Sequence, residues 1–210
     1  MRVIKSVVTT DAILTSSNIP EDEYPAWVSG TSYTALDKVI YEHKIYERII
    51  TGAGTTPPDL DQVNWLDSGY TNRYRMFDNI ISSVSSRTGG IEFTLTPNQV
   101  INGIALLNVN ASTVRVVMND SIEGVVYDRT KELRSSSNVI DYYSYFFAPL
   151  INLGDLDTAI FLDLPNKPTA TITVYVSSGA ALVEVGEVVY GVQSVVGRTN
   201  YGTAIGVTSY

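Results

Sequence analysis

The strongest constraint on the fold of this chain is a series of short runs rich in β-branched and aromatic residues, separated by turn-forming residues. In residues 170–176 threonine alternates with apolar residues, the pattern of a strand with one face in the core. The two prolines of the preceding turn, 165–168, stop ladder pairing because proline donates no backbone hydrogen bond. Further runs are residues 91–96, 104–109, 113–118, 124–127, 159–164 and 180–189. The series predicts an all-β fold with an antiparallel, jelly-roll-like β-sandwich over residues 70–190, and helix only as a turn near residues 128–134.

The first residues predict a strand rather than a targeting or membrane segment. Residues 1–8 are apolar but short, Lys5 interrupts them, and they run directly into the polar Thr9-Thr10-Asp11. We therefore expect residues 1–23 to form an N-terminal strand and arm that pack on the β body, without membrane insertion.

A second kind of segment precedes the sandwich, because aromatic residues are spaced regularly between the two tryptophans of the chain, Trp27 and Trp65. The runs 38–42 and 44–49 are strand-like, and His43-Lys44 is expected to connect them. So short a segment cannot bury an ordinary core, so large aromatic side chains must supply most of its apolar area. The pattern predicts a mini-domain of short strands over residues 24–69.

The order Trp27, Tyr33, Asp37, Val39, Tyr41, Tyr46, Pro57 and Trp65 resembles the chitin- and cellulose-binding modules of carbohydrate-binding families 5 and 12. The resemblance implies a small carbohydrate-module-like fold, with Trp27, Tyr33, Tyr46 and Trp65 as glycan-binding candidates. Two interpretations remain open: these rings form the core of the mini-domain, which we favour, or one or more of them form a binding face. Ile49-Ile50-Thr51 occupies the place where the family commonly has exposed rings, and Leu36 replaces a family glycine.

Most of the chain also resembles a group of tailed-bacteriophage virion proteins. The resemblance is carried by residues 10–18 (Thr-Asp-Ala-Ile-Leu-Thr-Ser-Ser-Asn), 24–27 (Tyr-Pro-Ala-Trp), 71–78 (Thr-Asn-Arg-Tyr-Arg-Met-Phe-Asp) and 197–202 (Gly-Arg-Thr-Asn-Tyr-Gly). It implies a tail, neck or adsorption component of a virion, assembled in the host cytoplasm with other virion proteins.

Two further segments are expected to make contacts, one between the mini-domain and the sandwich and the other between subunits. In residues 72–78, Met76 and Phe77 should be buried where the mini-domain meets the sandwich, with Arg73, Arg75 and Asp78 making charge-assisted bonds there. Residues 191–210 are expected to form an extended arm on a neighbouring subunit of a homo-oligomer, with a simple edge strand as the alternative. Fourteen tyrosines against five phenylalanines also favour half-exposed aromatic interfaces.

Charge and residue inventory argue against other functions. A net charge of −8 disfavours nucleic-acid binding, and the absence of cysteine excludes disulfides and thiolate metal sites. His43 is the single histidine, and neither a Gly-x-Ser-x-Gly nor a phosphate-binding glycine motif occurs. The pairs Asp59 with Asp61 and Asp155 with Asp157 are interpreted as solvated loop acids; the alternatives are glycoside hydrolysis and, for the second pair, a Ca²⁺ site.

The sequence thus predicts no enzyme, cofactor or metal site. The leading hypothesis is a structural component of a bacteriophage particle, of the tail or neck, that assembles through its subunits and carries an outward-facing carbohydrate-module-like domain. The alternative is an adsorption protein that binds a host receptor or surface glycan. An accessory depolymerase is the third hypothesis.

Overall fold

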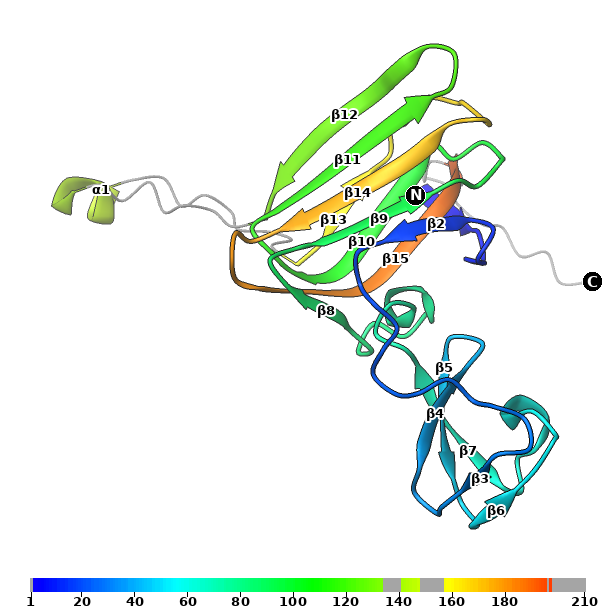
Figure 1. Cartoon of the computed structure of the whole chain (residues 1–210). Helices are drawn as coiled ribbons and strands as arrows, with labels where there is room; N and C mark the ends of the chain where they lie inside the picture. Colours follow the sequence, from blue (N-terminus) through cyan, green and yellow to red (C-terminus); the bar gives the residue numbers. More distant parts are fainter. Residues whose placement is uncertain (1, 134–140, 148–156, 196, 198–210) are drawn as a thin grey trace, which may run out of the picture.

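The computed structural model describes residues 2–133, 141–147, 157–195 and 197, and over these the protein is all-β, as predicted (Figure 1). Two antiparallel sheets form a sandwich. The first has the order β1 (Arg2–Ser6), β15 (Leu182–Val195), β10 (Gly103–Asn110) and β13 (Ala159–Phe161), with β8 (Ser85–Thr88) also paired to β15. The second has the order β12 (Gly124–Glu132), β11 (Thr113–Asp120), β14 (Thr171–Ser177), β9 (Ile91–Leu95) and β2 (Leu14–Ser17).

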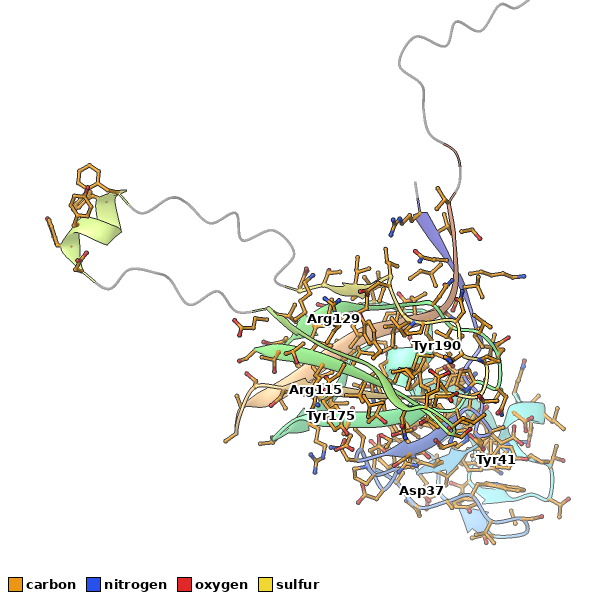
Figure 2. All side chains as sticks on the ribbon, turned by 90° about the horizontal axis from the view of Figure 1, so that it is seen from above. Asp37, Tyr41, Arg115, Arg129, Tyr175 and Tyr190 are labelled. Atoms are coloured by element: carbon orange, nitrogen blue, oxygen red, sulfur yellow. The ribbon has the colours of Figure 1, made fainter. Side chains whose placement is uncertain are left out.

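Alternation places the core between these sheets. In β14 the apolar residues Ile172, Val174 and Val176 are buried, whereas the intervening side chains are only half-buried. Tyr190 of β15 is fully buried (Figure 2), and its hydroxyl lies 2.9 Å from Thr9 Oγ1. This hydrogen bond joins the N-terminal segment to the interior of the sandwich.

One expected element is wrong. Residues 128–132, expected to be part of a helical turn, continue strand β12, because they pair in register with β11 from Val117↔Asp128 to Thr113↔Glu132. Arg115 also donates two hydrogen bonds to Asp128 across the strands, at 2.8 and 2.6 Å. Pairing with β11 therefore makes residues 128–132 a strand rather than a helical turn. The α-helix of the described residues is α1, Tyr142–Phe147, and no helix in the described ranges is long and apolar enough to cross a membrane.

Strand β15 extends beyond residue 190, where the sequence placed the start of an arm. Its last residues pair with β1, from Ser6↔Gly191 to Arg2↔Val195. Gly191 permits this close approach, because a Cβ at this position would lie 1.8 Å from the carbonyl oxygen of Lys5. Residues 196 and 198–210 lie outside the described residues, so the arm there stays a prediction.

The mini-domain has its own strands and core. Its larger sheet has the order β4 (Lys38–Tyr41), β5 (Lys44–Arg48) and β7 (Trp65–Tyr70), and β3 (Ser32–Tyr33) pairs with β6 (Gly52–Ala53). A 3₁₀-helix, η1 (Pro58–Leu60), precedes β7. Glu42 and His43 make the β4–β5 turn with φ of +45° and +64°, so the connection lies one residue earlier than expected.

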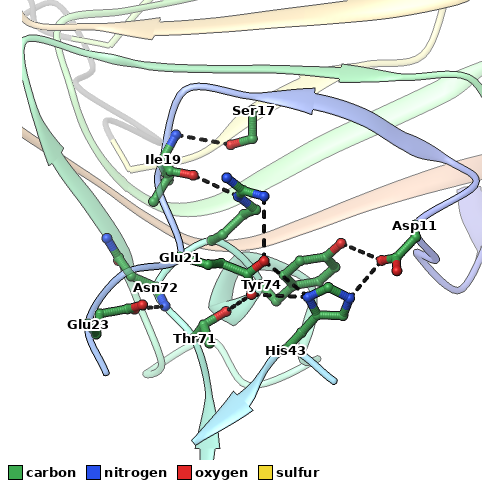
Figure 3. Close-up of polar contacts among 10 residues, drawn as sticks. Asp11, Ser17, Ile19, Glu21, Glu23, His43, Thr71, Asn72 and Tyr74 are labelled. Atoms are coloured by element: carbon green, nitrogen blue, oxygen red, sulfur yellow. Dashed lines mark hydrogen bonds and ion pairs between the residues drawn. The ribbon is translucent and has the colours of Figure 1, made fainter. Parts of the chain in front are cut away.

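The mini-domain joins the sandwich through segments that are far apart in sequence. The chain enters it through residues 19–25 and leaves through residues 70–74, where Thr71 Oγ1 donates to Glu21 at 2.6 Å and the Asn72 N–H donates to Glu23 (Figure 3). Arg73 Nε donates to the Ile19 carbonyl at 2.7 Å. The segments that enter and leave the mini-domain are thus hydrogen-bonded to each other; we call them the two crossings.

The junction motif behaves as predicted for its apolar and basic residues. Met76, in the 3₁₀-helix η2 (Arg75–Phe77), is fully buried, and its N–H donates to Ser85 Oγ at 2.9 Å. Phe77 is half-buried, and its ring meets that of Phe93 edge to face at 5.6 Å. Arg75 Nε donates to the Tyr70 carbonyl at 3.2 Å. The expected bond from Asp78 across the seam is instead local, to the N–H of Ile80.

Candidate functional site

The four aromatic candidates lie together in the mini-domain. Trp65 and Tyr46 are 3% and 5% exposed and form its core with Val39, while Trp27 and Tyr33 are half-buried against them. The ring of Tyr33 meets that of Trp65 edge-on, with centroids 5.2 Å apart. The rings are therefore packed mainly on one another, which agrees with the core interpretation of the sequence pattern.

Sequence reasoning missed a buried cation in this core. The Arg48 side chain is 4% exposed, and its guanidinium carbon lies 4.9 Å from the ring centroid of Trp65. Arg48 Nε donates to the Ile50 carbonyl at 2.6 Å and Nη2 to the Gly52 carbonyl at 3.2 Å. Backbone carbonyls thus satisfy this charge, and the adjoining loop is fixed around it.

Leu36, the residue that replaces the expected glycine, adopts a backbone conformation that favours glycine. Its φ is +75°, a left-handed conformation that glycine adopts without strain and leucine does not. Its N–H donates to the Arg48 carbonyl at 2.7 Å, which holds the turn in place.

A pocket of about 480 Å³ opens beside the aromatic core, between β5, η1 and β7. Its lining combines buried apolar side chains with polar ones nearer the surface. The buried apolar side chains are Tyr46, Pro58 and Trp65, the polar ones are Lys44, Asp59, Gln62 and Asp67, and Leu66 adds an exposed apolar side chain. Two of the four predicted candidates, Tyr46 and Trp65, therefore contribute to a cavity, although neither presents an open ring face.

An ion pair occupies one side of this pocket. Lys44 Nζ lies 2.7 Å from Asp67 Oδ2, and this hydrogen bond raises the pKa of Lys44. Partial burial raises the pKa of Asp67, but hydrogen bonds from Lys44 and from the Gly69 N–H outweigh burial and lower it below its ordinary value. Both groups are charged at neutral pH.

The other polar side chains of the pocket are available to a ligand. Asp59 and Gln62 are exposed, and within the described part of the chain neither side chain makes a hydrogen bond or ion pair. A carboxylate accepts hydrogen bonds, and an amide both donates and accepts them. Such groups over an apolar floor suit a polyhydroxylated ligand with C–H faces.

The structure gives structural roles to other candidates. Asp61 accepts hydrogen bonds from the Asn64 amide at 3.0 and 2.9 Å, so it stabilises the turn before β7. Asp155 lies outside the described residues, and Asp157 accepts a hydrogen bond from Thr158. No group of three or more metal-ligating side chains occurs among the residues described.

His43 belongs to the junction rather than to a ligand site. Its Nε2 lies 2.7 Å from Asp11 Oδ1 and its Nδ1 lies 3.0 Å from Glu21 Oε1 (Figure 3). The imidazole can donate to both carboxylates only when both nitrogens carry protons. These contacts fix the mini-domain, and hence its pocket, against the sandwich.

Comparison with known proteins finds a partial structural likeness to several solved structures. Neither the family models nor the curated proteins give a match. An F5/8 type C domain from Bacteroides fragilis is 9% identical, with a TM-score of 0.36 over 56% of this chain and 79% of that one. The lectin domain of lectinolysin, complexed with Lewis b antigen, is 12% identical, with a TM-score of 0.37 over 55% and 80%.

A fucose-binding module from Streptococcus pneumoniae is 11% identical, with a TM-score of 0.37 over 58% of this chain and 85% of that one. All three TM-scores are below 0.5, and no functional residue is carried over from these structures.

Proposed function

We propose that this chain is a structural component of a bacteriophage particle, of the tail or neck, whose mini-domain binds saccharide on the host surface. The observation that carries the binding part is the pocket beside Trp65, with its apolar floor and with Asp59 and Gln62, whose side chains make no hydrogen bond to any described residue. The sequence resemblance to carbohydrate modules supports the ligand class. The resemblance to virion proteins supports the location.

The pocket has the size and chemistry that this role needs. A volume of about 480 Å³ falls within the range of about 300–1,000 Å³ that is common for small-molecule pockets. A site with so few polar contacts should bind one saccharide weakly, with a Kd of about 10 µM to 1 mM. Repetition on a symmetric particle would raise the overall affinity by roughly 10²–10⁴ without new contacts.

A second observation favours a role in assembly. In helix α1 the side chains of Tyr142, Tyr143 and Phe147 are 81%, 72% and 69% exposed. Large aromatic residues are enriched at protein interfaces, and a concentration of exposed ones typically marks a contact surface. We assign this surface to contacts with other virion proteins or with further copies of this chain.

Binding is tested by screening the purified protein against host-surface polysaccharides and oligosaccharides. Substituting Gln62 by alanine should weaken binding of any positive ligand by roughly three- to tenfold, because one hydrogen-bonding group is lost. Gln99→Ala is the matched control, since Gln99 is exposed and lies on the sandwich. Equal binding by the two variants would remove the pocket from the proposal.

Assembly is tested separately by light scattering of the full chain and of a chain that ends at Val195. This end point keeps the pairing of β1 with β15. A defined oligomer that is lost on truncation would support an assembling arm. A monomer in both cases would count against the assembly role.

A further inference from the structure

Three charged side chains line the mini-domain pocket, and one of them lacks a partner. Lys44 and Asp67 form an ion pair at 2.7 Å. Asp59, in η1, is exposed and makes no ion pair or hydrogen bond with its side chain within the described residues. The pocket therefore carries one net negative charge, and within the described residues the Asp59 carboxylate is the charged group that makes no ion pair.

Burial and nearby carboxylates act in the same direction on two phenol groups around the pocket. Burial raises the pKa of Tyr46, Asp67 and Asp59 raise it further, and Lys44 lowers it. At the neighbouring Tyr41, burial, Glu42 and Asp59 all raise the pKa. The surroundings thus disfavour an anion at the pocket floor. An overall charge of −8 adds to the repulsion of an acidic ligand at low salt.

From these observations we infer that the pocket selects saccharides with a free, protonated amine over acetylated or acidic ones, and that Asp59 is the residue that determines this selectivity. The inference rests on the proposed function, because it names the ligand class of the same pocket. The ammonium group of an amino sugar donates hydrogen bonds and carries the charge that Asp59 complements. Gln62 is left for a hydroxyl, and the apolar floor is left for the C–H face.

The competing ligand classes lack one of these features. An N-acetylated sugar has the same ring but no charge, so it keeps the contacts with Gln62 and the floor and loses the one with Asp59. A uronic or sialic acid places a carboxylate near Asp59, and like charges at short range repel. The pocket should therefore rank the classes as amino sugar, acetylated sugar, acidic sugar.

The test compares glucosamine and N-acetylglucosamine oligomers of equal length by calorimetry with the full chain at low salt. Wild type should bind the glucosamine oligomer roughly three- to tenfold more tightly, between the effects of an exposed ion pair and a charge-assisted hydrogen bond. Asp59→Asn should abolish this preference, because it should weaken binding of the glucosamine oligomer roughly three- to tenfold more than binding of the acetylated oligomer. Asp22→Asn, which removes the same charge from another exposed position, should keep the preference.

The outcomes separate this inference from the proposed function. Equal binding of both oligomers by wild type, or a preference that survives Asp59→Asn, overturns the charge selectivity and leaves saccharide binding standing. Tighter binding of an acidic oligosaccharide overturns it in the same way. If no saccharide binds at millimolar concentration, the proposed binding function fails, and the selectivity fails with it.

Discussion

The imidazole ring of His43 stacks on the phenol ring of Tyr74, with the ring centroids 3.9 Å apart and the planes inclined by 25°. His43 comes from the β4–β5 turn of the mini-domain, whereas Tyr74 belongs to the chain that returns to the sandwich. Asp11 closes the arrangement, because it accepts hydrogen bonds from the Tyr74 hydroxyl and from His43, both at 2.7 Å. One turn of the small domain is thus held by residues that lie more than twenty positions away.

Removing this ring should loosen the junction. His43→Ala loses the stack and both carboxylate contacts, so the free energy of unfolding should fall by about 1–3 kcal/mol. Hydrogen exchange should accelerate at the Thr71 N–H, which donates to the His43 carbonyl at 2.8 Å, and stay unchanged in β14. His43→Gln, which keeps one donor, should lie between the two. Exchange that is identical in all three proteins would show that the contacts do not hold the domain.

Acid should weaken the same junction. Hydrogen bonds from Tyr74 and then from His43 lower the pKa of Asp11 below its ordinary value of 3.8. A carboxyl whose pKa is lowered on folding contributes stability above its unfolded pKa, and the contribution is lost as pH falls through the folded pKa. Urea unfolding midpoints should therefore fall less steeply below about pH 4 in Asp11→Asn than in wild type. Parallel pH profiles would contradict this role.

Gly191 should tolerate no side chain. A Cβ would meet the Lys5 carbonyl oxygen at 1.8 Å, so Gly191→Ala must push β1 away from β15. We expect a loss of about 1–3 kcal/mol, measured as a lower Tm. Gly54→Ala is the matched control, because nothing lies within 4 Å of the added carbon and the φ is not positive. Similar Tm values for the two variants would refute the packing argument.

Arg48 should be essential to the mini-domain alone. Arg48→Lys cannot reproduce two directed hydrogen bonds together with the contact on Trp65, so it should destabilise this domain by about 2–3 kcal/mol. Tryptophan fluorescence isolates the effect, because both tryptophans of the chain lie in the mini-domain. Circular dichroism of the whole chain, most of whose strand residues lie in the sandwich, serves as the comparison. A single unfolding transition shifted equally in both signals would mean that the two parts unfold together.

Sequence reasoning succeeded where the pattern is local. Strands β9, β11 and β14 were predictable because their side chains alternate between core and surface, and the alternation is visible in the residues themselves. Residues 128–132 contain several charged side chains and no apolar stripe, so only their pairing with β11 shows that they are a strand.

In the candidate site, too, some residues are recognisable from the local sequence and others only from strand pairing. Tyr46 and Trp65, which line the pocket, were named as candidates from aromatic spacing, whereas Lys44, Asp59, Gln62 and Asp67 have no local signature. They meet only because β5 pairs with β7 in the register Tyr46↔Asp67 and because η1 precedes β7. His43 was placed correctly near a strand connection, but Asp11 and Glu21 could not be foreseen as its partners.

The paired crossings at Glu21–Thr71 and Glu23–Asn72 have an evolutionary consequence. A segment whose two ends leave the body at one place can be exchanged for another with equally close ends, without changing the strand order of the sandwich. The mini-domain is therefore an exchangeable insertion in the sandwich. Another small domain with equally close ends can take the place of residues 24–69 above the same sandwich.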